Sequence, residues 1–231
     1  MFLSKYLENI VKRFNNGKYG QAIECAEYVL RRIYLLDIGE APLIKLLYIN
    51  ALFEQFVSGI DPNIELIAKA NMGCREFWCA RDNLTKDLLK EVSILAPRIF
   101  YLLADYRNYG GDKKEAVRAA MIVANAYPNS SRAQFSLAWI LCQEKKYIQA
   151  YEVLGGLPKD NSDCLIAGRI WLCKAKIFLA IGLVENAQCA LTYAERYFLN
   201  VKPQNRIVAD VEEVCEFRDE ILKHLERAAA C

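Results

Sequence analysis

The side chains best suited to chemistry in this 231-residue chain are one histidine and nine cysteines. His224 would be the only imidazole able to act as a general base, and it lies near the end of a charged C-terminal segment. A cation near a helix C-terminus interacts favourably with the last carbonyl groups, so this position has a structural explanation. No serine–histidine–carboxylate set can be built around it, and no glycine-rich loop is followed by Lys-Ser or Lys-Thr. We therefore predict that the protein is not an enzyme and uses no cofactor.

The cysteines do not follow a metal-binding pattern. Only Cys74 and Cys79 are close together, there is no CxxC motif, and a single histidine is available as a further ligand. The others are scattered through apolar segments, which is typical of buried thiols in a reducing compartment. We expect no metal site and a cytoplasmic location. The cysteines are Cys25, Cys74, Cys79, Cys142, Cys164, Cys173, Cys189, Cys215 and Cys231.

Composition and charge exclude further classes of protein. Apolar residues make up 54% of the chain, which is enough for a substantial core. Thirty basic and twenty-eight acidic residues leave a formal charge of +2, so a strongly basic nucleic-acid surface is not expected. The N-terminus interleaves charged with apolar residues, unlike a signal peptide, and apolar runs such as "IFLAIGLV" are far shorter than the roughly 18 residues of a membrane span.

Apolar residues recur at intervals of three and four almost throughout, whereas the alternation typical of strands is nearly absent. Clusters of Gly, Pro, Asn and Asp separate segments of ordinary helix length. The pattern predicts an all-α fold of about twelve antiparallel helices. No linker of low complexity interrupts them, so we predict one continuous domain over 1–231.

The segment "YGGDKKEAVRAAMIVANAYPNS", Tyr109 to Ser130, is part of an internal repeat. When this segment is moved 34 residues along the chain, two of its alanines fall on alanines again. A further move of 37 residues reaches a third copy, which holds Ala175, Gly182, Ala187 and Ala194. An earlier copy holds Gly17, Ala22 and Ala26. The residues that define the first shift are Ala104, Gly111, Ala116 and Pro128, against Ala138, Lys145, Ala150 and Ser162.

With this spacing the chain resembles the tetratricopeptide-repeat family. The resemblance implies a right-handed superhelical solenoid of antiparallel helix hairpins. It also implies small residues where the two helices of a hairpin touch, and a glycine in left-handed geometry at the turn between them. The small residues would be Ala22, Ala116, Ala150 and Ala187. Because each hairpin leaves an apolar side open, several must stack.

The resemblance covers the chain unevenly. We expect a first hairpin in 1–36, three hairpins in 97–201 and a capping helix in 204–229. The capping helix would bury Val211, Val214, Ile221 and Leu225 on one face. Residues 40–96 depart from the pattern and are expected to form irregular helices without the small-residue signature.

In this family the first helix of each hairpin lines a concave groove, and its second, fifth, ninth and twelfth residues face the ligand. The resemblance therefore implies a groove in which arginine occupies the same position three times. Its candidate ligand-binding residues are Arg98, Tyr101, Asp105, Arg132, Phe135, Trp139, Arg169 and Lys176, with Asn108, Cys142, Leu172 and Leu179 completing the register.

Two interpretations of these residues stay open. The arginines could pair with the carboxylates of an acidic peptide while the aromatic rings supply anchors. Alternatively, each arginine begins a helix after a proline or polar turn and lies in solvent, and Phe135 or Trp139 belongs to the core between repeats. The Lys and Asn clamp that co-chaperones of this family use for chaperone C-termini is absent, since those places hold Tyr101, Asp105, Phe135 and Trp139.

We expect a non-enzymatic adaptor or scaffold that binds a partner segment in the groove. The alternative is a permanent subunit of a larger assembly, suggested by the apolar residues of 43–57 and the nine thiols. A helical repeat that binds single-stranded RNA is a third hypothesis, disfavoured by the near-neutral charge.

Overall fold

The computed structural model describes residues 5–32, 40–57, 63–106, 112–155, 157, 164–201 and 208–229. Within these ranges the chain forms eleven α-helices and one short 3-10 helix, with no strand. The predicted all-α fold is therefore confirmed. The chain divides into two compact units, Met1–Ala119 and Ala120–Cys231. A single continuous domain over 1–231 stays a prediction.

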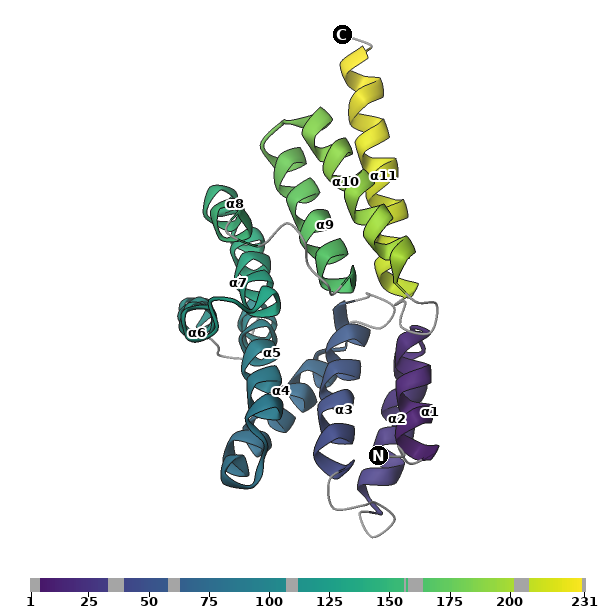
Figure 1. Cartoon of the computed structure of the whole chain (residues 1–231), viewed down its shortest axis with the longest axis vertical. Helices are drawn as coiled ribbons and strands as arrows, with labels where there is room; N and C mark the ends of the chain where they lie inside the picture. Colours follow the sequence, from purple (N-terminus) through teal and green to yellow (C-terminus); the bar gives the residue numbers. More distant parts are fainter. Residues whose placement is uncertain are drawn as a thin grey trace. The chain divides into compact units, whose positions relative to one another are not determined.

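The first unit is a series of helices in which each packs on the next (Figure 1). Contacts join α1 to α2, α2 to α3, α3 to α4 and α4 to α5, and α3 also contacts both α1 and α5. A short 3-10 helix, Arg81–Asn83, lies between α4 and α5. The helices are α1 (Lys5–Asn15), α2 (Tyr19–Leu30), α3 (Glu40–Val57), α4 (Ile64–Cys79) and α5 (Lys86–Asp105). Helix α6 (Lys113–Ala126) begins in this unit and ends in the second.

The second unit repeats this arrangement. Helix α7 contacts α8 and α9, α9 contacts α10 and α11, and Figure 1 shows α9, α10 and α11 side by side. The odd-numbered helices therefore contact one another within each unit, as the first helices of stacked hairpins do. The helices are α7 (Ser131–Gln143), α8 (Tyr147–Gly155), α9 (Cys164–Ala180), α10 (Val184–Asn200) and α11 (Val208–Ala229).

Small residues lie at the helix crossings. The four alanines predicted there are all buried, in α2, α6, α8 and α10. Residues 40–96 were predicted to lack this signature, and that prediction is wrong for α4. A Cβ on Gly73 would lie 2.7 Å from Cγ1 of Ile49 in α3, and the neighbouring Ala70 and Cys74 are buried. Small residues therefore lie at the α3–α4 contact too.

Three of the turns share one hydrogen-bonding pattern. Gly17, Lys145 and Gly182 have positive φ values of 70°, 57° and 82°. In each turn the N–H of this residue donates to the carbonyl three residues earlier, and the next N–H donates to the carbonyl five residues before it, as in the Schellman motif. The predicted left-handed glycines are confirmed at Gly17 and Gly182, and Gly111 lies outside the described residues.

Helix α5 differs from the expectation that Arg98 begins a helix. Thr85 caps the helix by accepting a hydrogen bond from the N–H of Leu88 at 3.4 Å, and the helix then continues through Pro97. An interior proline is unfavourable by about 3 kcal/mol. The apolar row that the helix buries on both sides of Pro97 offsets this, because its residues share one face: Val92, Leu95, Ile99 and Leu103.

The C-terminal helix α11 packs as predicted. Val214 and Ile221 are buried against α9 and α10, and Leu225 is packed beside them. Phe217 is buried on the same face, which the sequence pattern had not indicated. The side chain of Val211 lies outside the described residues.

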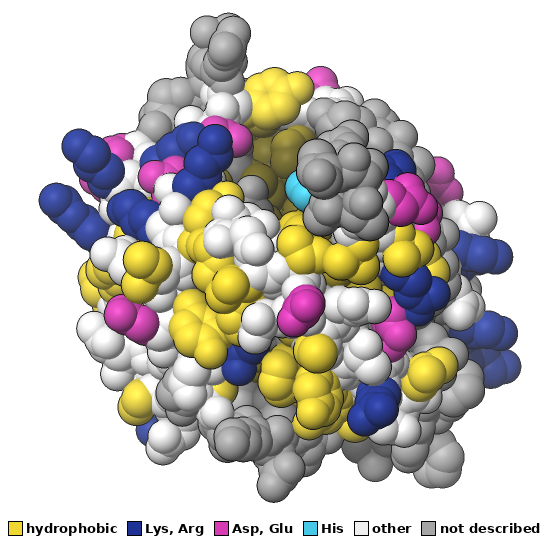
Figure 2. All heavy atoms as spheres, turned by 90° about the horizontal axis from the view of Figure 1, so that it is seen from above, with side chains coloured by type: hydrophobic (Ala, Val, Ile, Leu, Met, Phe, Trp, Pro, Cys, Tyr) yellow, Lys and Arg dark blue, Asp and Glu magenta, His cyan; other side chains and the backbone are white. Residues whose placement is uncertain are grey.

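Apolar side chains also reach the surface. The most exposed are in the second unit, where Ile148 of α8 is 74% and Leu199 of α10 is 70% accessible. On the face drawn in Figure 2, apolar side chains are interspersed with charged ones. Within the described ranges, every helix is too short or too polar to cross a bilayer.

Candidate functional site

In the first unit, the predicted groove residues make contacts within their own unit. The guanidinium of Arg98 lies 4.4 Å from the ring centroid of Phe53 in α3 and is half-buried. Tyr101 is only 3% exposed. Asp105 forms an ion pair with Lys113 of α6, whose ammonium also lies 5.4 Å from the Tyr101 ring. Lys113 thus links two of the predicted residues to α6.

In the second unit, the predicted residues lie on α7 and α9. Arg132 is exposed in the first turn of α7, where Ser130 caps the helix by accepting from the N–H of Ala133 at 3.4 Å. Trp139 and Arg169 are half-buried. Lys176 is exposed and forms an ion pair with Glu213 of α11.

Two of the predicted aromatic anchors are core residues. Phe135 is 7% exposed, and Tyr101 is buried to a similar degree. A ring that is already covered has little surface left to desolvate against a ligand, so neither can act as the anchor first expected. For Phe135 the burial favours the alternative left open above, a place in the core.

Two pairs of side chains connect helices of the second unit. We call Cys142, Cys173, Lys176 and Glu213 the α7–α9–α11 strip, because they join these three helices. The Sγ atoms of Cys142 and Cys173 are 3.5 Å apart, and Lys176 reaches Glu213. Cys142 and Lys176 are both register positions, at the twelfth and ninth places of successive first helices.

The pKa values of the two thiols of the strip shift in opposite directions. The hydrogen bond with Cys173 lowers the pKa of Cys142, burial opposes this, and the positive charge of Lys176 lowers the pKa further. The pKa of Cys173 is raised well above its usual value, first by the hydrogen bond to Cys142 and then by burial. Cys142 is therefore the thiol that ionises more readily.

Sequence reasoning missed two members of the strip. Cys173 belongs to the scattered apolar thiols of the sequence analysis, and Glu213 was not singled out there. No signal in the sequence indicated the contact between the two thiols, because the 37-residue shift of the repeat aligns Cys142 with Leu179 and not with Cys173. For Glu213 no such signal existed, because the pairing depends on how α11 packs against α9.

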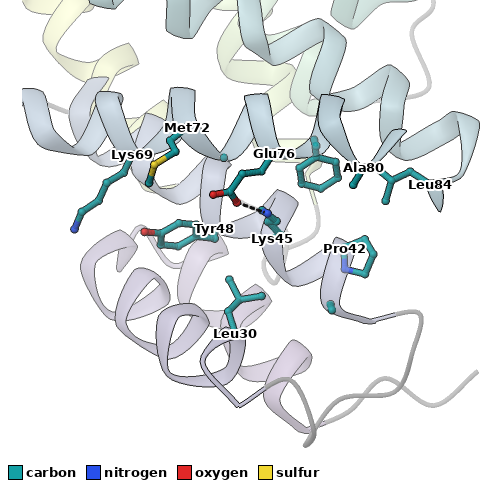
Figure 3. Close-up of a pocket in the computed structure, with 12 residues that line it drawn as sticks. Leu30, Pro42, Lys45, Tyr48, Lys69, Met72, Glu76, Ala80 and Leu84 are labelled. Carbon is teal, nitrogen blue, oxygen red and sulfur yellow. Dashed lines mark ion pairs between the residues drawn. The ribbon is translucent and has the colours of Figure 1, made fainter. Parts of the chain in front are cut away.

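A cavity of about 390 Å³ lies in the first unit, between α3 and α4, with Leu30 of α2 at its edge (Figure 3). Figure 3 shows Lys45 of α3 and Glu76 of α4 pointing toward one another, and they form an ion pair. Its other lining is largely apolar, including Pro42, Met72, Phe77 and Leu84. The sequence had not indicated it, because it falls within the segment expected to be irregular.

Tyr48 is one of the polar residues that line this cavity. Its hydroxyl donates to Oε1 of Glu27 at 2.9 Å, and Nζ of Lys69 lies 3.8 Å from the same oxygen. Burial, followed by the hydrogen bond to Glu27, raises the pKa of Tyr48 well above its usual value. Tyr48 therefore stays protonated and keeps its donor role at any physiological pH.

The described residues hold no arrangement suited to metal binding. No group of three His, Cys, Asp or Glu side chains is placed to hold an ion in those ranges. His224 is exposed on α11. The cavity holds an ion-paired lysine, an ion-paired carboxylate and a protonated tyrosine, which is a set suited to binding by shape and hydrogen bonds.

Comparison with known proteins adds little to these observations. No protein-family model matches the chain. No curated protein matches it either. Among solved structures it is similar to one described as "MamA AMB-1", with a TM-score of 0.38 and 18% identity over 85% of this chain and 92% of that chain. A likeness this low transfers no function.

Proposed function

We propose that this chain is a non-enzymatic protein-interaction module of the tetratricopeptide-repeat kind, which binds a partner segment along the odd-numbered helices of one unit. The observation that carries the proposal is that Cys142 contacts Cys173, while Lys176 lies close enough to affect the pKa values of both thiols. The register positions Cys142 and Lys176 come from successive first helices, and a shared face is what a groove built from such helices requires.

The second unit offers the better surface for this function. Arg132 is exposed on α7, and Arg169 and Lys176 lie seven residues apart on α9, which places them on one helix face. Trp139 of α7 is half-buried, so it retains some ring surface for contact. Cationic side chains on α7 and α9 and a partly exposed indole on α7 favour an acidic partner segment with at least one apolar side chain, although Lys176 is already paired with Glu213.

In the first unit, fewer side chains are available to bind a partner segment. Arg98 stacks on Phe53 and is half-buried, so its guanidinium is held in a defined orientation. Asp105 is already paired with Lys113. We therefore propose Arg98 as a contact for the partner, and Tyr101 and Phe135 as residues that support the helices from the core.

The test is affinity capture of the tagged chain from its own cell lysate, compared with the double variant Arg132→Glu/Arg169→Glu. Arg118→Glu is the matched control, because Arg118 is exposed on α6 outside the register. Charge reversal at the binding face should weaken partner binding at least tenfold, roughly 1.4 kcal/mol, while the thermal melt by circular dichroism stays unchanged. Equal capture by all three proteins would show that the odd-numbered helices are not the binding face.

A permanent subunit of a larger assembly is the alternative function. Exposed apolar side chains on α8 and α10, with Ile148 and Leu199 the most accessible, favour it. In that case the same stoichiometric partners would co-purify with the wild type and with the double variant.

A further inference from the structure

The α7–α9–α11 strip contains two thiols that come from neighbouring hairpins. Cys142 lies in the last turn of α7 and Cys173 in the middle of α9, and their sulfur atoms are 3.5 Å apart. A disulfide bond is about 2.05 Å long. Closing the difference requires movement of roughly 1.5 Å, which is within the reach of side-chain rotation and small helix shifts.

We propose that Cys142 and Cys173 form a redox modification site, a dithiol that a hydroperoxide converts into a disulfide joining α7 to α9. Among the cysteines that the structure describes, no second pair of thiols is in hydrogen-bonding contact. Cys79, Cys189 and Cys215 are exposed, and Cys74 is buried with a pKa raised to about 12. The pair therefore differs from every other described cysteine.

The two thiols have different parts in the reaction. Cys142 is half-buried and lies within the field of the Lys176 ammonium, whose other neighbour is the carboxylate of Glu213. Cys173 is 6% exposed. A small oxidant can therefore reach Cys142, whose lowered pKa favours the reactive thiolate, whereas Cys173 is shielded and acts as the resolving thiol.

The chemistry balances with the peroxide as the two-electron oxidant. The Cys142 thiolate attacks one peroxide oxygen, the O–O bond breaks, and the departing hydroxide takes the proton lost from the thiol and leaves as water. Cys142 is then a sulfenic acid. The Cys173 sulfur attacks the Cys142 sulfur, the S–O bond breaks, and the hydroxyl leaves with the Cys173 proton as a second water. Two thiols and one peroxide thus become one disulfide and two waters.

The experiment treats the full reduced chain with one equivalent of hydrogen peroxide, blocks the remaining thiols with N-ethylmaleimide, and maps peptides by mass spectrometry without reduction. We expect a cross-linked peptide containing Cys142 and Cys173, lighter by two hydrogens than the two peptides together. In Cys173→Ser, Cys142 should accumulate as a sulfenic acid that dimedone traps. In Cys142→Ser, Cys173 should stay reduced. Cys215→Ser is the matched control and should cross-link like the wild type.

Two further readouts separate the site from general oxidation. The bond joins residues 31 apart, so oxidation should raise the Tm by several degrees, dithiothreitol should reverse this, and Cys173→Ser should not show it. Lys176→Gln should slow the first step several-fold, whereas Glu213→Gln, which removes only the partner of Lys176, should not.

Two results would overturn the proposal. One is oxidation of the exposed cysteines before any cross-link between Cys142 and Cys173 forms. The other is a cross-link between Cys142 and Cys173 that forms only under denaturing conditions, because the folded chain would then not bring the two thiols together. The site does not depend on partner binding, since both readouts are made on the isolated chain.

Discussion

At the scale of single residues, glycines decide how closely two helices can approach. Gly73 lets α4 approach α3 so closely that a methyl group there would overlap Ile49, which is itself fully buried. A tightly packed core tolerates such an addition only by shifting its neighbours. By contrast, a Cβ on Gly20 of α2 would meet only the Gln55 side chain, at 3.7 Å, which is an ordinary contact.

We predict opposite effects for alanine at these two glycines. Gly73→Ala should lower the free energy of unfolding by about 1–2 kcal/mol, because overlap with Ile49 outweighs the better helix propensity of alanine. Gly20→Ala should leave it unchanged or raise it by up to about 1 kcal/mol. Urea denaturation of both variants measures this. Stabilisation by Gly73→Ala would mean that α3 and α4 lie farther apart.

Cys74 gives the fold a dependence on pH. Burial raises the pKa of its thiol from 9.0 to about 12. Between these values the unfolded chain loses the proton and the folded chain keeps it. The contribution of the Cys74 thiol to the free energy of unfolding is therefore fully present below pH 9 and is lost as pH rises toward 12.

The difference in stability between the wild type and Cys74→Ala should reveal this. We expect that difference to fall by about 2 kcal/mol between about pH 8 and about pH 10.5, measured by urea denaturation at both pH values. Cys79→Ala is the control on the same helix, because Cys79 is exposed and should show no such change. A difference that stays constant with pH for Cys74→Ala would mean that the thiol is not shielded from water.

At the scale of elements, three hairpin turns share the same left-handed geometry although glycine occupies it in two turns and lysine in the third. Gly17 and Gly182 take the left-handed position at no steric cost. Lys145 takes the same position with φ of 57° and makes the same two backbone hydrogen bonds, although its Cβ makes this conformation unfavourable by about 1–2 kcal/mol. The hydrogen bonds and the helix contacts on either side hold it there.

Exchanging residues at these turns should therefore change stability in opposite directions. Lys145→Gly should raise the free energy of unfolding by about 1 kcal/mol, and Gly182→Ala should lower it by about the same amount. No atom lies within 4 Å of a Cβ built on Gly182, so the loss would come from the backbone alone. Thermal melts of both variants measure this, and a destabilised Lys145→Gly would contradict the turn geometry.

At the scale of the whole molecule, each compact unit is a stack in which odd-numbered helices contact one another. This arrangement fits a helical-repeat protein. It also leaves apolar side chains such as Ile148 and Leu199 on the surface of the second unit. Whether these residues are covered by a partner distinguishes an adaptor from an assembly subunit.

Light scattering after size exclusion tests this. For an adaptor we expect a monomer near 26.4 kDa over a wide concentration range. The double variant Ile148→Ser/Leu199→Ser should elute identically and unfold at the same temperature, because exposed side chains contribute little to the core. Concentration-dependent oligomers that the double variant abolishes would favour the subunit instead.

The sequence by itself determined the features that depend on short-range periodicity and steric fit. These are the helical class, the small residues at Ala22, Ala116, Ala150 and Ala187, and the left-handed turns at Gly17 and Gly182. Each follows from the spacing of residues within one or two helical turns, or from the repeat of that spacing along the chain.

Only the tertiary structure decided the features that depend on distant neighbours. Helix α5 continues through Pro97 because its apolar face is buried by other helices, and Phe135 is core because its surroundings cover it. The contact between Cys142 and Cys173 and the pairing of Lys176 with Glu213 span 31 and 37 residues. Propensity and spacing within one helix carry no information about such pairs, since they form only when separate hairpins stack.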